Sequence, residues 1–417
     1  MTPLKIALIH NLKPAKKQPG LPPDYYSECD SAKTVAAIAA ALKKGGHTVF
    51  PVEADQRLPR WLSDHSMDLA FNIAEGFEGE DREARVPALM ELLEIPYTGS
   101  GVLALVLALD KAKTKQIFRS AGIPTPNFQL FQHPDEVLDA RLKHPLIVKP
   151  NREGSAKGIS SASVVHHESA LRLQVRQIME QYRQEALVEE YIEGMELTVG
   201  VLGQETILPV LEIDFSECRP SGEFFYSWRM KEYQGDKSLH LVPRFWCPAR
   251  LSPEVTQAVQ NVAWKAAKVL GTRDIARVDI RLSSDGIPYV LEVNPLPGID
   301  PEESNFPIMV RAAGLSYEAF VNQLVGFAVK RSSKLSKSTQ AAPVLLEGAA
   351  SYVPLSNKNA RHSAVPVHGT TMPKEIPQTS TGPVPGTPDV PAVTIRNPAR
   401  PRGKIRNNDP KEGHLGR

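Results

Sequence analysis

The stretch 277–304 constrains the fold of this chain most, because it predicts a β-hairpin that carries its own chemistry. Two alternating apolar segments flank the turn sequence Ser-Ser-Asp-Gly at 283–286, which is the pattern of a hairpin. Asp279 lies in the first segment, whereas Glu292 and Asn294 lie two apart in the second and so project from one face. Strand pairing would bring Asp279 opposite them, and three oxygen-bearing side chains would then converge as Mg²⁺ demands.

A solvated hairpin with ordinary surface acids is the competing interpretation, and it suffices for an isolated Asp and Glu-x-Asn. Arg277 beside the acids and the Pro-Gly turn at 297–298 shift the balance toward a site for a metal ion and a phosphate. The rest of the chain has to decide between these two interpretations.

The end of the chain differs from the rest in composition. Residues 331–417 carry thirteen Lys and Arg against five Asp and Glu, together with twelve Pro and almost no aromatic residues. Such a segment cannot bury enough apolar surface to offset chain entropy, so we predict a Pro-rich, basic and disordered tail over 336–417. A plain solvated tail and a weak electrostatic tether to an anionic partner, lipid or nucleic acid, are both open.

The whole-chain composition limits the function classes. A length of 417 residues allows two or three domains, and a net charge of only +2 argues against a general nucleic-acid-binding protein. Three widely spaced cysteines form neither a disulfide framework nor a zinc motif and fit a reducing compartment. No apolar run reaches the length of a membrane span, and 4–10 read as a short strand rather than a signal peptide. We therefore expect a cytoplasmic protein without a transmembrane segment.

The first 122 residues alternate strand and helix signals. Strands are predicted over 4–10, 48–52 and 67–73, and helices over 31–44, 82–93 and 102–121. This order indicates an open, mostly parallel sheet, in which ligands bind beyond the carboxyl ends of the strands. The segments 10–11 and 72–79 are therefore candidate parts of a site.

The following region reads as mixed α+β and partly antiparallel. Its predicted strands are 145–150, 186–194, 195–202 and 207–213, and its predicted helices are 252–270 and 317–329. We place the domain boundaries so that an N-terminal α/β domain covers 1–122, two further subdomains cover 123–200 and 201–335, and the tail covers 336–417.

Lys149 ends a predicted strand and precedes the polar loop 151–160, in which Gly154 and Gly158 bracket three residues. The amides of such a loop can bend toward an anion, and Lys149 adds a point charge suited to phosphate. A plain sheet edge is the alternative for this motif taken alone, and the chain has no Walker sequence.

Two acidic segments are further candidates. The run 189–192 would expose backbone groups to a purine edge, and Glu196 would reach a ribose, although a solvated strand end is the simpler interpretation. Glu75, at the end of a predicted strand, would meet an amine, whereas Glu80 and Asp81 are explained by the dipole of the helix that they precede.

Taken together, these motifs resemble the D-alanine–D-alanine ligases of the ATP-grasp superfamily, over about residues 1–330 and in the family's order. They read Y-T-G-S-G at 97–101, L-D-K-A-K-T-K at 109–115, V-K-P-N-R-E-G-S at 148–155, E-E-Y-I-E-G-M-E-L-T-V at 189–199, and R-V-D at 277–279 with E-V-N-P-L-P-G at 292–298. The resemblance implies an α/β and α+β fold: an N-terminal open parallel sheet domain, then a two-subdomain ATP-grasp fold with ATP between two antiparallel sheets.

The resemblance also implies roles for individual residues. The ATP-binding set would be Lys111, Lys149, Glu189, Glu190, Tyr191, Ile192 and Glu196. Two Mg²⁺ ions, with Mn²⁺ as an alternative, would be held by Asp279, Glu292 and Asn294. The catalytic set would be Arg277 and Gly298 at the oxyanion, Ser155 in a loop that closes on substrate, and Lys231. The substrate-facing set would be Glu28, Glu75 and Ser304.

The sequence departs from the family pattern near the substrates. Glu75 stands where the family has a histidine, and a carboxylate prefers a cationic or hydrogen-bond-donating partner, so the first pocket differs from one for plain D-alanine. Glu28 is the nearest counterpart of the family glutamate that meets the substrate amine. Lys231 fits the family lysine, but the next residue is Glu232, and Tyr233 fits the family tyrosine only with a shift of one residue.

The implied activity is an ATP-dependent ligase that joins a carboxylate to an amine through an acyl phosphate, nominally making D-alanyl-D-alanine for the peptidoglycan of the cell wall. Two alternatives stay open: a related ligase for another amino acid or small carboxylic acid, and a catalytically idle nucleotide-binding module. The expected partners are ATP and amino acids, with no specific nucleic acid, and a homodimer is left open.

Overall fold

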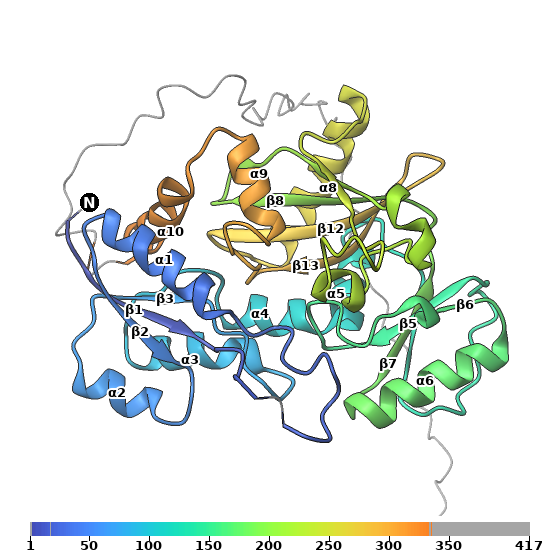
Figure 1. The fold of residues 1–417 in the computed structure, drawn as a ribbon, viewed down its shortest axis with the longest axis horizontal. Helices are drawn as coiled ribbons and strands as arrows, with labels where there is room; N and C mark the ends of the chain where they lie inside the picture. Colours follow the sequence, from blue (N-terminus) through green and yellow to red (C-terminus); the bar gives the residue numbers. More distant parts are fainter. Residues whose placement is uncertain (1, 17, 333–334, 336–417) are drawn as a thin grey trace, which may run out of the picture. The chain divides into compact units, whose positions relative to one another are not determined.

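The computed structural model describes residues 2–16, 18–332 and 335 of the chain. Within this part, three β-sheets are flanked by helices (Figure 1). The tail predicted over 336–417 lies outside the described residues. No helix in the described ranges is both long enough and apolar enough to span a membrane.

The first sheet has the strand order β2-β1-β3, and its strands are parallel, as predicted. Its strands are β1 (Lys5–His10), β2 (Thr48–Glu53) and β3 (Leu69–Asn72). The helix α1 (Ala32–Lys44) starts where the Ser31 hydroxyl accepts a hydrogen bond from the Thr34 amide, and it ends at Gly45. The apolar side chains of α1 pack on one face of this sheet, and α2 (Leu58–Asp64) and α3 (Arg85–Leu92) pack on the other.

Two predicted helices of this region are interrupted. The helix expected over 102–121 is two helices, α4 (Val102–Leu109) and α5 (Lys111–Ser120). Asp110 separates them, because its backbone is extended (φ −84°, ψ 97°) and its side chain accepts a hydrogen bond from the Lys113 amide at 3.0 Å. The helix expected over 82–93 begins as the 3₁₀ turn η1 (Arg82–Ala84) before α3 continues it.

The second sheet is antiparallel and has the order β4-β7-β5-β6. Its strands are β4 (Phe128–Phe131), β5 (Leu146–Pro150), β6 (Val164–Val165) and β7 (Ala186–Glu190). The helix α6 (Glu168–Tyr182), which the sequence analysis missed, covers one face through a buried apolar cluster. The loop 151–160 leaves the end of β5 and is tied down by the helical turn η2 (Ser161–Ser163).

The third sheet is also antiparallel, with the order β11-β10-β8-β12-β13, and β9 pairs with β8. Its strands are β8 (Gly194–Leu202), β9 (Thr206–Ile207), β10 (Leu211–Asp214), β11 (Arg244–Trp246), β12 (Ile275–Ser283) and β13 (Pro288–Asn294). The strand expected over 207–213 is split, because Pro209 has no amide hydrogen to donate to a ladder. The helix α8 (Pro253–Val269) packs against this sheet, with Ser252 as its N-cap and Pro253 in its first turn, as predicted.

The buried cluster that includes α1 joins the two ends of the described chain. The helices α9 (Asn305–Ala312) and α10 (Tyr317–Arg331) add Phe306 and Phe320 to this cluster; α10 packs on α1, and α9 packs on β8 and β10 of the third sheet. Between these ends, the change from the second sheet to the third falls between β7 and β8, at 190–194. The domain boundaries that we drew from sequence stay a prediction.

Candidate active site

The hairpin of β12 and β13 has the register that its sequence predicts. Asp279 pairs with Glu292, and Arg277 pairs with Asn294, in an antiparallel ladder with a bulge directly after Asp279. Residues directly opposite each other in such a ladder project from the same face. The three oxygen-bearing side chains therefore lie together.

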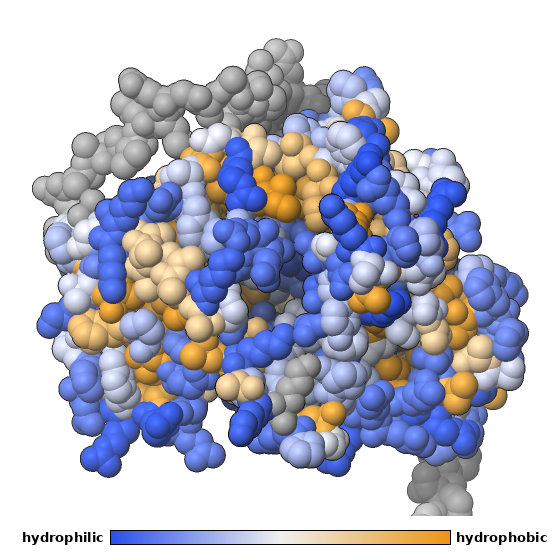
Figure 2. Space-filling model, in the orientation of Figure 1, coloured by the Kyte–Doolittle hydropathy of each residue, from blue (hydrophilic) through white to orange (hydrophobic). Residues whose placement is uncertain are grey.

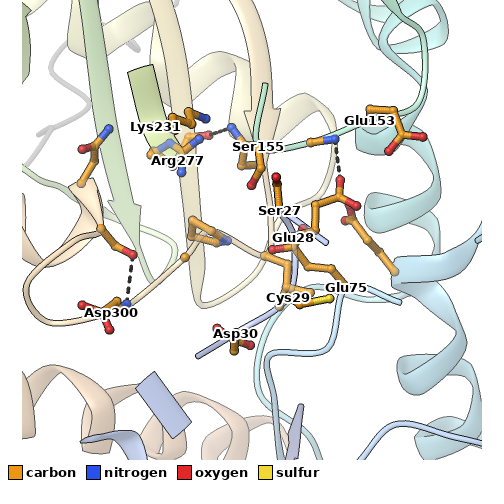
Figure 3. A pocket seen from close by; sticks show the side chains of 18 of the residues that line it. Ser27, Glu28, Cys29, Asp30, Glu75, Glu153, Ser155, Lys231, Arg277 and Asp300 are labelled. Atoms are coloured by element: carbon orange, nitrogen blue, oxygen red, sulfur yellow. Dashed lines mark hydrogen bonds between the residues drawn. The ribbon is translucent and has the colours of Figure 1, made fainter. Parts of the chain in front are cut away.

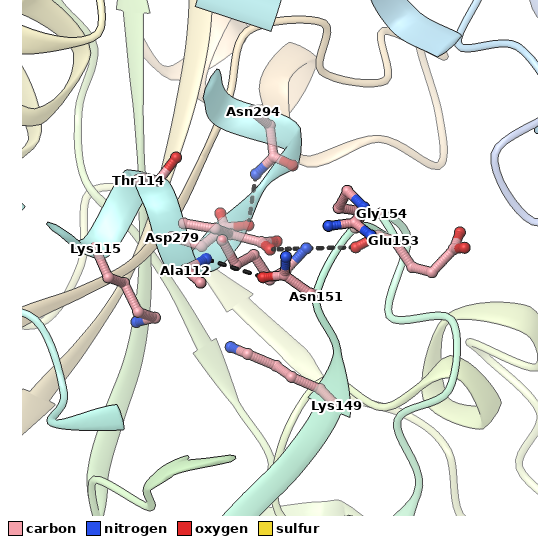
Figure 4. A network of polar contacts seen from close by, with 12 residues as sticks. Ala112, Thr114, Lys115, Lys149, Asn151, Glu153, Gly154, Asp279 and Asn294 are labelled. Atoms are coloured by element: carbon pink, nitrogen blue, oxygen red, sulfur yellow. Dashed lines mark hydrogen bonds and ion pairs between the residues drawn. The ribbon is translucent and has the colours of Figure 1, made fainter. Parts of the chain in front are cut away.

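Asp279 is the most contacted of the three. Its carboxylate accepts two hydrogen bonds from Arg277, at 2.9 and 2.8 Å, and one from the Thr198 hydroxyl at 2.6 Å. The Asn294 amide also donates to Asp279, at 3.0 Å (Figure 4). Arg277, predicted for an oxyanion, is thus held by a bidentate ion pair with its neighbour two residues along the strand.

Glu292 lies among cations. Its carboxylate is 3.3 Å from the Lys111 ammonium, which also donates to the Glu153 carbonyl at 2.5 Å. Burial alone would raise the pKa of Glu292, but Lys111, Lys149, Lys231 and Arg277 together hold that pKa at about 2. Glu292 is therefore ionised at neutral pH.

The donor set fits a hard divalent cation. Two carboxylates and one amide oxygen are ligands that Mg²⁺ and Mn²⁺ accept, and phosphate oxygens complete such shells in nucleotide enzymes. Within the described ranges, no group of three or more His, Cys, Asp or Glu side chains is placed like metal ligands. The protein side of such a shell would be Asp279, Glu292 and Asn294, with the remaining positions left to phosphate and water.

Lys149 and Glu189 face each other across neighbouring strands. The Lys149 ammonium donates to the Glu189 carboxylate at 2.5 Å, and Lys115 forms a second ion pair with the same carboxylate at 2.9 Å. Lys115 is fully buried, and burial lowers its pKa to about 8 although Glu189 opposes that shift. Glu189 therefore contacts two lysines, whereas the sequence analysis assigned it to the edge of a base.

A small cavity of about 100 Å³ opens between the second and third sheets. Its apolar walls include Ile147, Leu197 and Phe225, and its rim includes the predicted run 189–192 and Glu196. The Glu196 carboxylate forms an ion pair with Arg281 at 2.9 Å. A slot with apolar walls and exposed strand-end backbone suits a planar base.

A larger cavity of about 420 Å³ lies beside it. Figure 2 shows a hollow lined mainly by hydrophilic residues on this face of the molecule. The predicted site residues that line the larger cavity are Glu28, Glu75, Lys111, Ser155, Lys231, Arg277, Glu292, Asn294, Gly298 and Ser304. Both cavities are lined by Lys111, Lys231, Arg277 and Glu292, so the base slot and the larger cavity adjoin each other at these charged residues.

Glu28, which we predicted to meet a substrate amine, lines the larger cavity and also makes contacts within the protein, so its role toward substrate stays a prediction. Its buried carboxylate accepts hydrogen bonds from Arg82 at 2.8 Å and from the Gly154 amide at 2.6 Å, and it lies 3.3 Å from the Lys157 ammonium. Burial would raise the pKa of Glu28, but Arg82 and Lys157 lower it below its ordinary value. Through these donors, Glu28 ties the 151–160 loop to the N-terminal segment.

Further contacts hold the same loop over the cavity. The Gly158 amide donates to Asp24 at 2.7 Å, and Asp24 also accepts from the Tyr182 hydroxyl at 2.6 Å. Ser155, at the tip, has a left-handed backbone with φ 49° and lines the cavity. The arrangement is that of a loop folded down on its cavity.

Lys231 comes from the short helix α7 (Trp228–Glu232) and lines both cavities. Its ammonium lies 5.0 Å from the centre of the Tyr226 ring, a cation–π contact. Burial, followed by the charge of Arg277, lowers the pKa of Lys231.

Glu232 lines the larger cavity and pairs with Lys13, whereas Tyr233 is 44 % exposed and lines neither cavity. The aromatic residue that faces both cavities is therefore Tyr226.

Gly298 and Ser304 meet at the start of α9. The Ser304 hydroxyl accepts a hydrogen bond from the Asp300 amide at 3.0 Å, and a Cβ atom at position 298 would come within 3.0 Å of that hydroxyl oxygen. The amides of the first turn of α9 lie just beyond, at a helix end that favours negative charge.

The cavity residues missed from the sequence include Asp30, Glu83, Tyr226 and Asn305, and the buried Lys115, which pairs with Glu189, was missed as well. Lys115 carried a usable signal, because it lies four residues after Lys111 on one helix and such residues share a face. The others carried none, because their positions depend on contacts between distant segments.

An open parallel sheet followed by two antiparallel sheets that close on a lysine-lined cleft defines an ATP-grasp ligase. The structure of a D-alanine–D-alanine ligase from Bacillus anthracis complexed with ATP matches with a TM-score of 0.62 and 25 % identity, over 81 % of this chain and 100 % of that one. The family model described as D-ala D-ala ligase C-terminus matches residues 117–326.

Relatives identify the family. A D-alanine–D-alanine ligase of Carboxydothermus hydrogenoformans is 38 % identical over 307 residues, which are 71 % of this chain and 92 % of the relative. The uncharacterized protein y4sG of Sinorhizobium fredii is 33 % identical over 305 residues, covering 71 % of this chain and 87 % of the relative. The chain belongs to the D-alanine–D-alanine ligase family and is an ATP-dependent ligase. The family, the fold class and the enzyme class predicted from sequence are thereby confirmed.

Proposed function

We propose that this ligase activates the carboxylate of one amino acid with ATP and joins it to the amine of a second, with D-alanyl-D-alanine as the nominal product. The observation that carries the proposal is the polarity of the larger cavity. Lys231 and Arg277 lie on the side that adjoins the base slot, whereas Asp30 and Glu75 lie elsewhere on its wall (Figure 3). An amino-acid zwitterion fits such a cavity with its carboxylate toward the cations and its ammonium toward the acids.

ATP would lie with its base in the slot beside 189–192 and with its phosphates toward Lys111 and Lys149. The Glu196–Arg281 pair at the rim offers a carboxylate to the ribose hydroxyls. The Lys149–Glu189 ion pair keeps the ammonium aimed along the strand until phosphate replaces part of that contact. These roles rest on the lining of the cavity and on the match to the family motifs.

Two Mg²⁺ ions are the metals we assign to Asp279, Glu292 and Asn294, because this set offers only hard oxygen donors and Glu292 stays ionised at neutral pH. When bound, the metal supplies charge that neutralises the transferring phosphoryl oxygens. The residues themselves hold the site open: Thr198 and Arg277 fix the Asp279 carboxylate, and Lys111 fixes Glu292.

The chemistry follows from these positions. The carboxylate oxygen of the first amino acid attacks the γ-phosphorus, the bond to the β-phosphate oxygen breaks, and an acyl phosphate and ADP result. The amine of the second amino acid, having lost a proton, attacks the acyl carbon, and inorganic phosphate leaves. The free side of Arg277 and the Gly298 amide would stabilise the tetrahedral oxyanion, and the α9 end at Ser304 would hold the second carboxylate. The 151–160 loop, folded over the cavity, keeps water from the acyl phosphate.

A ligase for a different amino acid is the second candidate, and Glu75 favours it. This carboxylate replaces the family histidine, and it faces the cavity without a hydrogen bond or ion pair from any described residue. An idle nucleotide-binding module has no such observation in its favour.

We place the reaction in the cytoplasm, where ATP is available, and the homodimer and the anionic partner of 336–417 remain predictions.

The test is phosphate release by the full chain with ATP and Mg²⁺, measured with D- and L-amino acids singly and in pairs. We expect turnover only when an amino-acid substrate is present, and a dipeptide in the product by mass spectrometry. The Glu292→Gln variant serves as the inactive control. ATP turnover that no amino acid stimulates would refute the proposal.

A further inference from the structure

Apart from the exposed Glu303, the larger cavity holds three carboxyl groups for which the described residues provide no hydrogen bond and no ion pair. They are those of Asp30, Glu75 and Glu83. Asp30 precedes the N-cap of α1, Glu75 follows β3, and Glu83 lies within η1. Three separate segments therefore present an unpaired acid to one space.

Glu83 shows that this is more than a surface cluster. Its residue is only 8 % exposed, yet its carboxyl lines the cavity and has no partner among the described residues. Burial, and then the charges of Glu28 and Glu292, raise the pKa of Glu83 to about 7 even though Arg82 and Lys111 oppose the shift. A carboxylate placed in this way is costly unless a donor or a cation reaches it from the cavity.

The neighbouring cations cannot serve all three acids, because other acids already hold them. Arg82 pairs with Glu28 at 2.8 Å and with Glu153 at 3.3 Å, and Lys157 pairs with the same two carboxylates. Two cations and two acids thus form a balanced buried group. The carboxyls of Asp30, Glu75 and Glu83 are a surplus of acidic groups beside it, and burial raises the pKa of each.

The other wall of the cavity has the opposite character. Lys231 is unpaired among the described residues apart from its contact with the Tyr226 ring, and Arg277 lies next to it. Figure 3 shows Lys231 and Arg277 in the upper part of the view and Glu75, Cys29 and Asp30 below them. The Cys29 thiol does not add a cation site, since burial and the nearby Glu75 raise its pKa to about 12.

We propose that the first amino-acid subsite accepts a diamino acid, an α-amino acid whose side chain carries a second cationic nitrogen. This proposal rests on the proposed ligase function. With the reacting carboxylate at Lys231 and Arg277, the α-ammonium neutralises one acid of the opposite wall. A side-chain ammonium neutralises a second, so that the surplus acids pair with charges that plain alanine lacks.

The test compares amino acids that differ in side-chain charge. Phosphate release is measured with 2,3-diaminopropionate, ornithine and lysine, in both D and L forms, against alanine and the uncharged norleucine, each with alanine as the second amino acid. We expect at least one diamino acid to exceed alanine and norleucine by roughly 10- to 100-fold in kcat/KM, the range of one charge-assisted hydrogen bond. The preference should appear in KM more than in kcat.

Variants tie the preference to the three acids. Glu83→Gln should reduce the advantage of the diamino acid toward 1 while turnover with alanine stays within about threefold, a change near the noise of such comparisons. Glu75→Gln should lower kcat/KM for the diamino acid more than for alanine. Both should fold, because an amide removes an unpaired buried charge. Glu180→Gln, on the exposed face of α6, is the matched control and should keep the advantage.

The outcomes separate the two proposals. Turnover with alanine equal to or better than with every diamino acid would overturn the diamino-acid subsite and leave the ligase function intact. Turnover with no amino acid would overturn the ligase function. In that case, calorimetry of the same diamino acids with a non-hydrolysable ATP analogue still decides the subsite, since an absence of binding, or binding that Glu75→Gln leaves unchanged, overturns it.

Discussion

Replacing Glu189 with glutamine should show how much its ion pairs with two buried lysines contribute to the stability of the fold. Glu189 is 1 % exposed and accepts from Lys149 at 2.5 Å and Lys115 at 2.9 Å. Removing one partner of a buried ion pair costs about 3 kcal/mol or more, because the remaining charge is left without compensation. We therefore expect Glu189→Gln to lower the free energy of unfolding by about 3 kcal/mol at pH 7.

The pH dependence of this loss follows from Lys115. Its folded pKa, about 8, is already below the value of 10.5 expected in the unfolded chain, and without Glu189 it must fall further. At pH 7 Lys115 then stays protonated in the folded wild type but loses its proton in the folded variant. In both unfolded chains Lys115 stays protonated. The stability of the variant consequently rises by about 1.4 kcal/mol between pH 7 and pH 8 while that of the wild type stays nearly flat. Above pH 8 Lys115 has lost its proton in both folded proteins, so the difference in free energy of unfolding between wild type and variant stops shrinking.

The assay is urea unfolding at pH 6, 7, 8 and 9, followed by far-UV circular dichroism and by tryptophan fluorescence. Glu193→Gln is the matched control, because Glu193 lies in the same segment and is exposed. A destabilisation of Glu189→Gln that is independent of pH, or no larger than that of the control, would refute the assignment of Lys115 and Glu189 as a coupled buried pair.

Three further predictions address the rest of the cavity. Gly298→Ala should raise the KM of the second amino acid at least tenfold with little change for ATP in steady-state assays, because the added Cβ would lie 3.0 Å from the Ser304 hydroxyl; equal effects on both substrates would contradict this. Asp30→Asn should raise the melting temperature at pH 7.5 by roughly 2 °C or more and leave it unchanged at pH 3.5. Burial and then Asp300 raise the folded pKa of Asp30 to about 7. Ionised Asp30 therefore lowers the stability of the wild type increasingly as the pH rises above 3.8, and this loss is absent below that pH. Glu292→Gln should fold like the wild type and lose turnover at least 100-fold, with weaker Mn²⁺ binding by calorimetry; retained turnover would remove Glu292 from the metal shell.

Local patterns in the sequence predicted much of the fold. The hairpin register at Asp279 and Glu292 followed from strand alternation and a turn signal, and the caps of α1 and α8 followed from Ser31 and Ser252. The errors also have local causes. Asp110 prefers to cap α5 over continuing a helix, and Pro209 interrupts a strand ladder.

The site was predicted unevenly, because its residues differ in how far their partners lie along the chain. Asp279, Glu292 and Arg277 belong to one hairpin, so a short motif contains their geometry. Glu28 meets Arg82 and the Gly154 amide, 54 and 126 residues away, and no spacing rule places such contacts. The unpaired state of Glu83 is equally invisible in the sequence, since it depends on which cations other acids have already taken.

The core shared by the two ends of the described chain bears on how the protein is made. The first sheet and α1 are complete once Asn72 has been synthesised, but α9, whose Phe306 belongs to the same buried cluster, begins only at Asn305. Roughly 230 residues separate these points, so at about 5–20 residues per second the cluster stays incomplete for on the order of 10 s or more on the ribosome. Throughout that interval the cluster lacks the apolar side chains of α9 and α10, and a chaperone that shields apolar surface would act on this stretch of the nascent chain before any other.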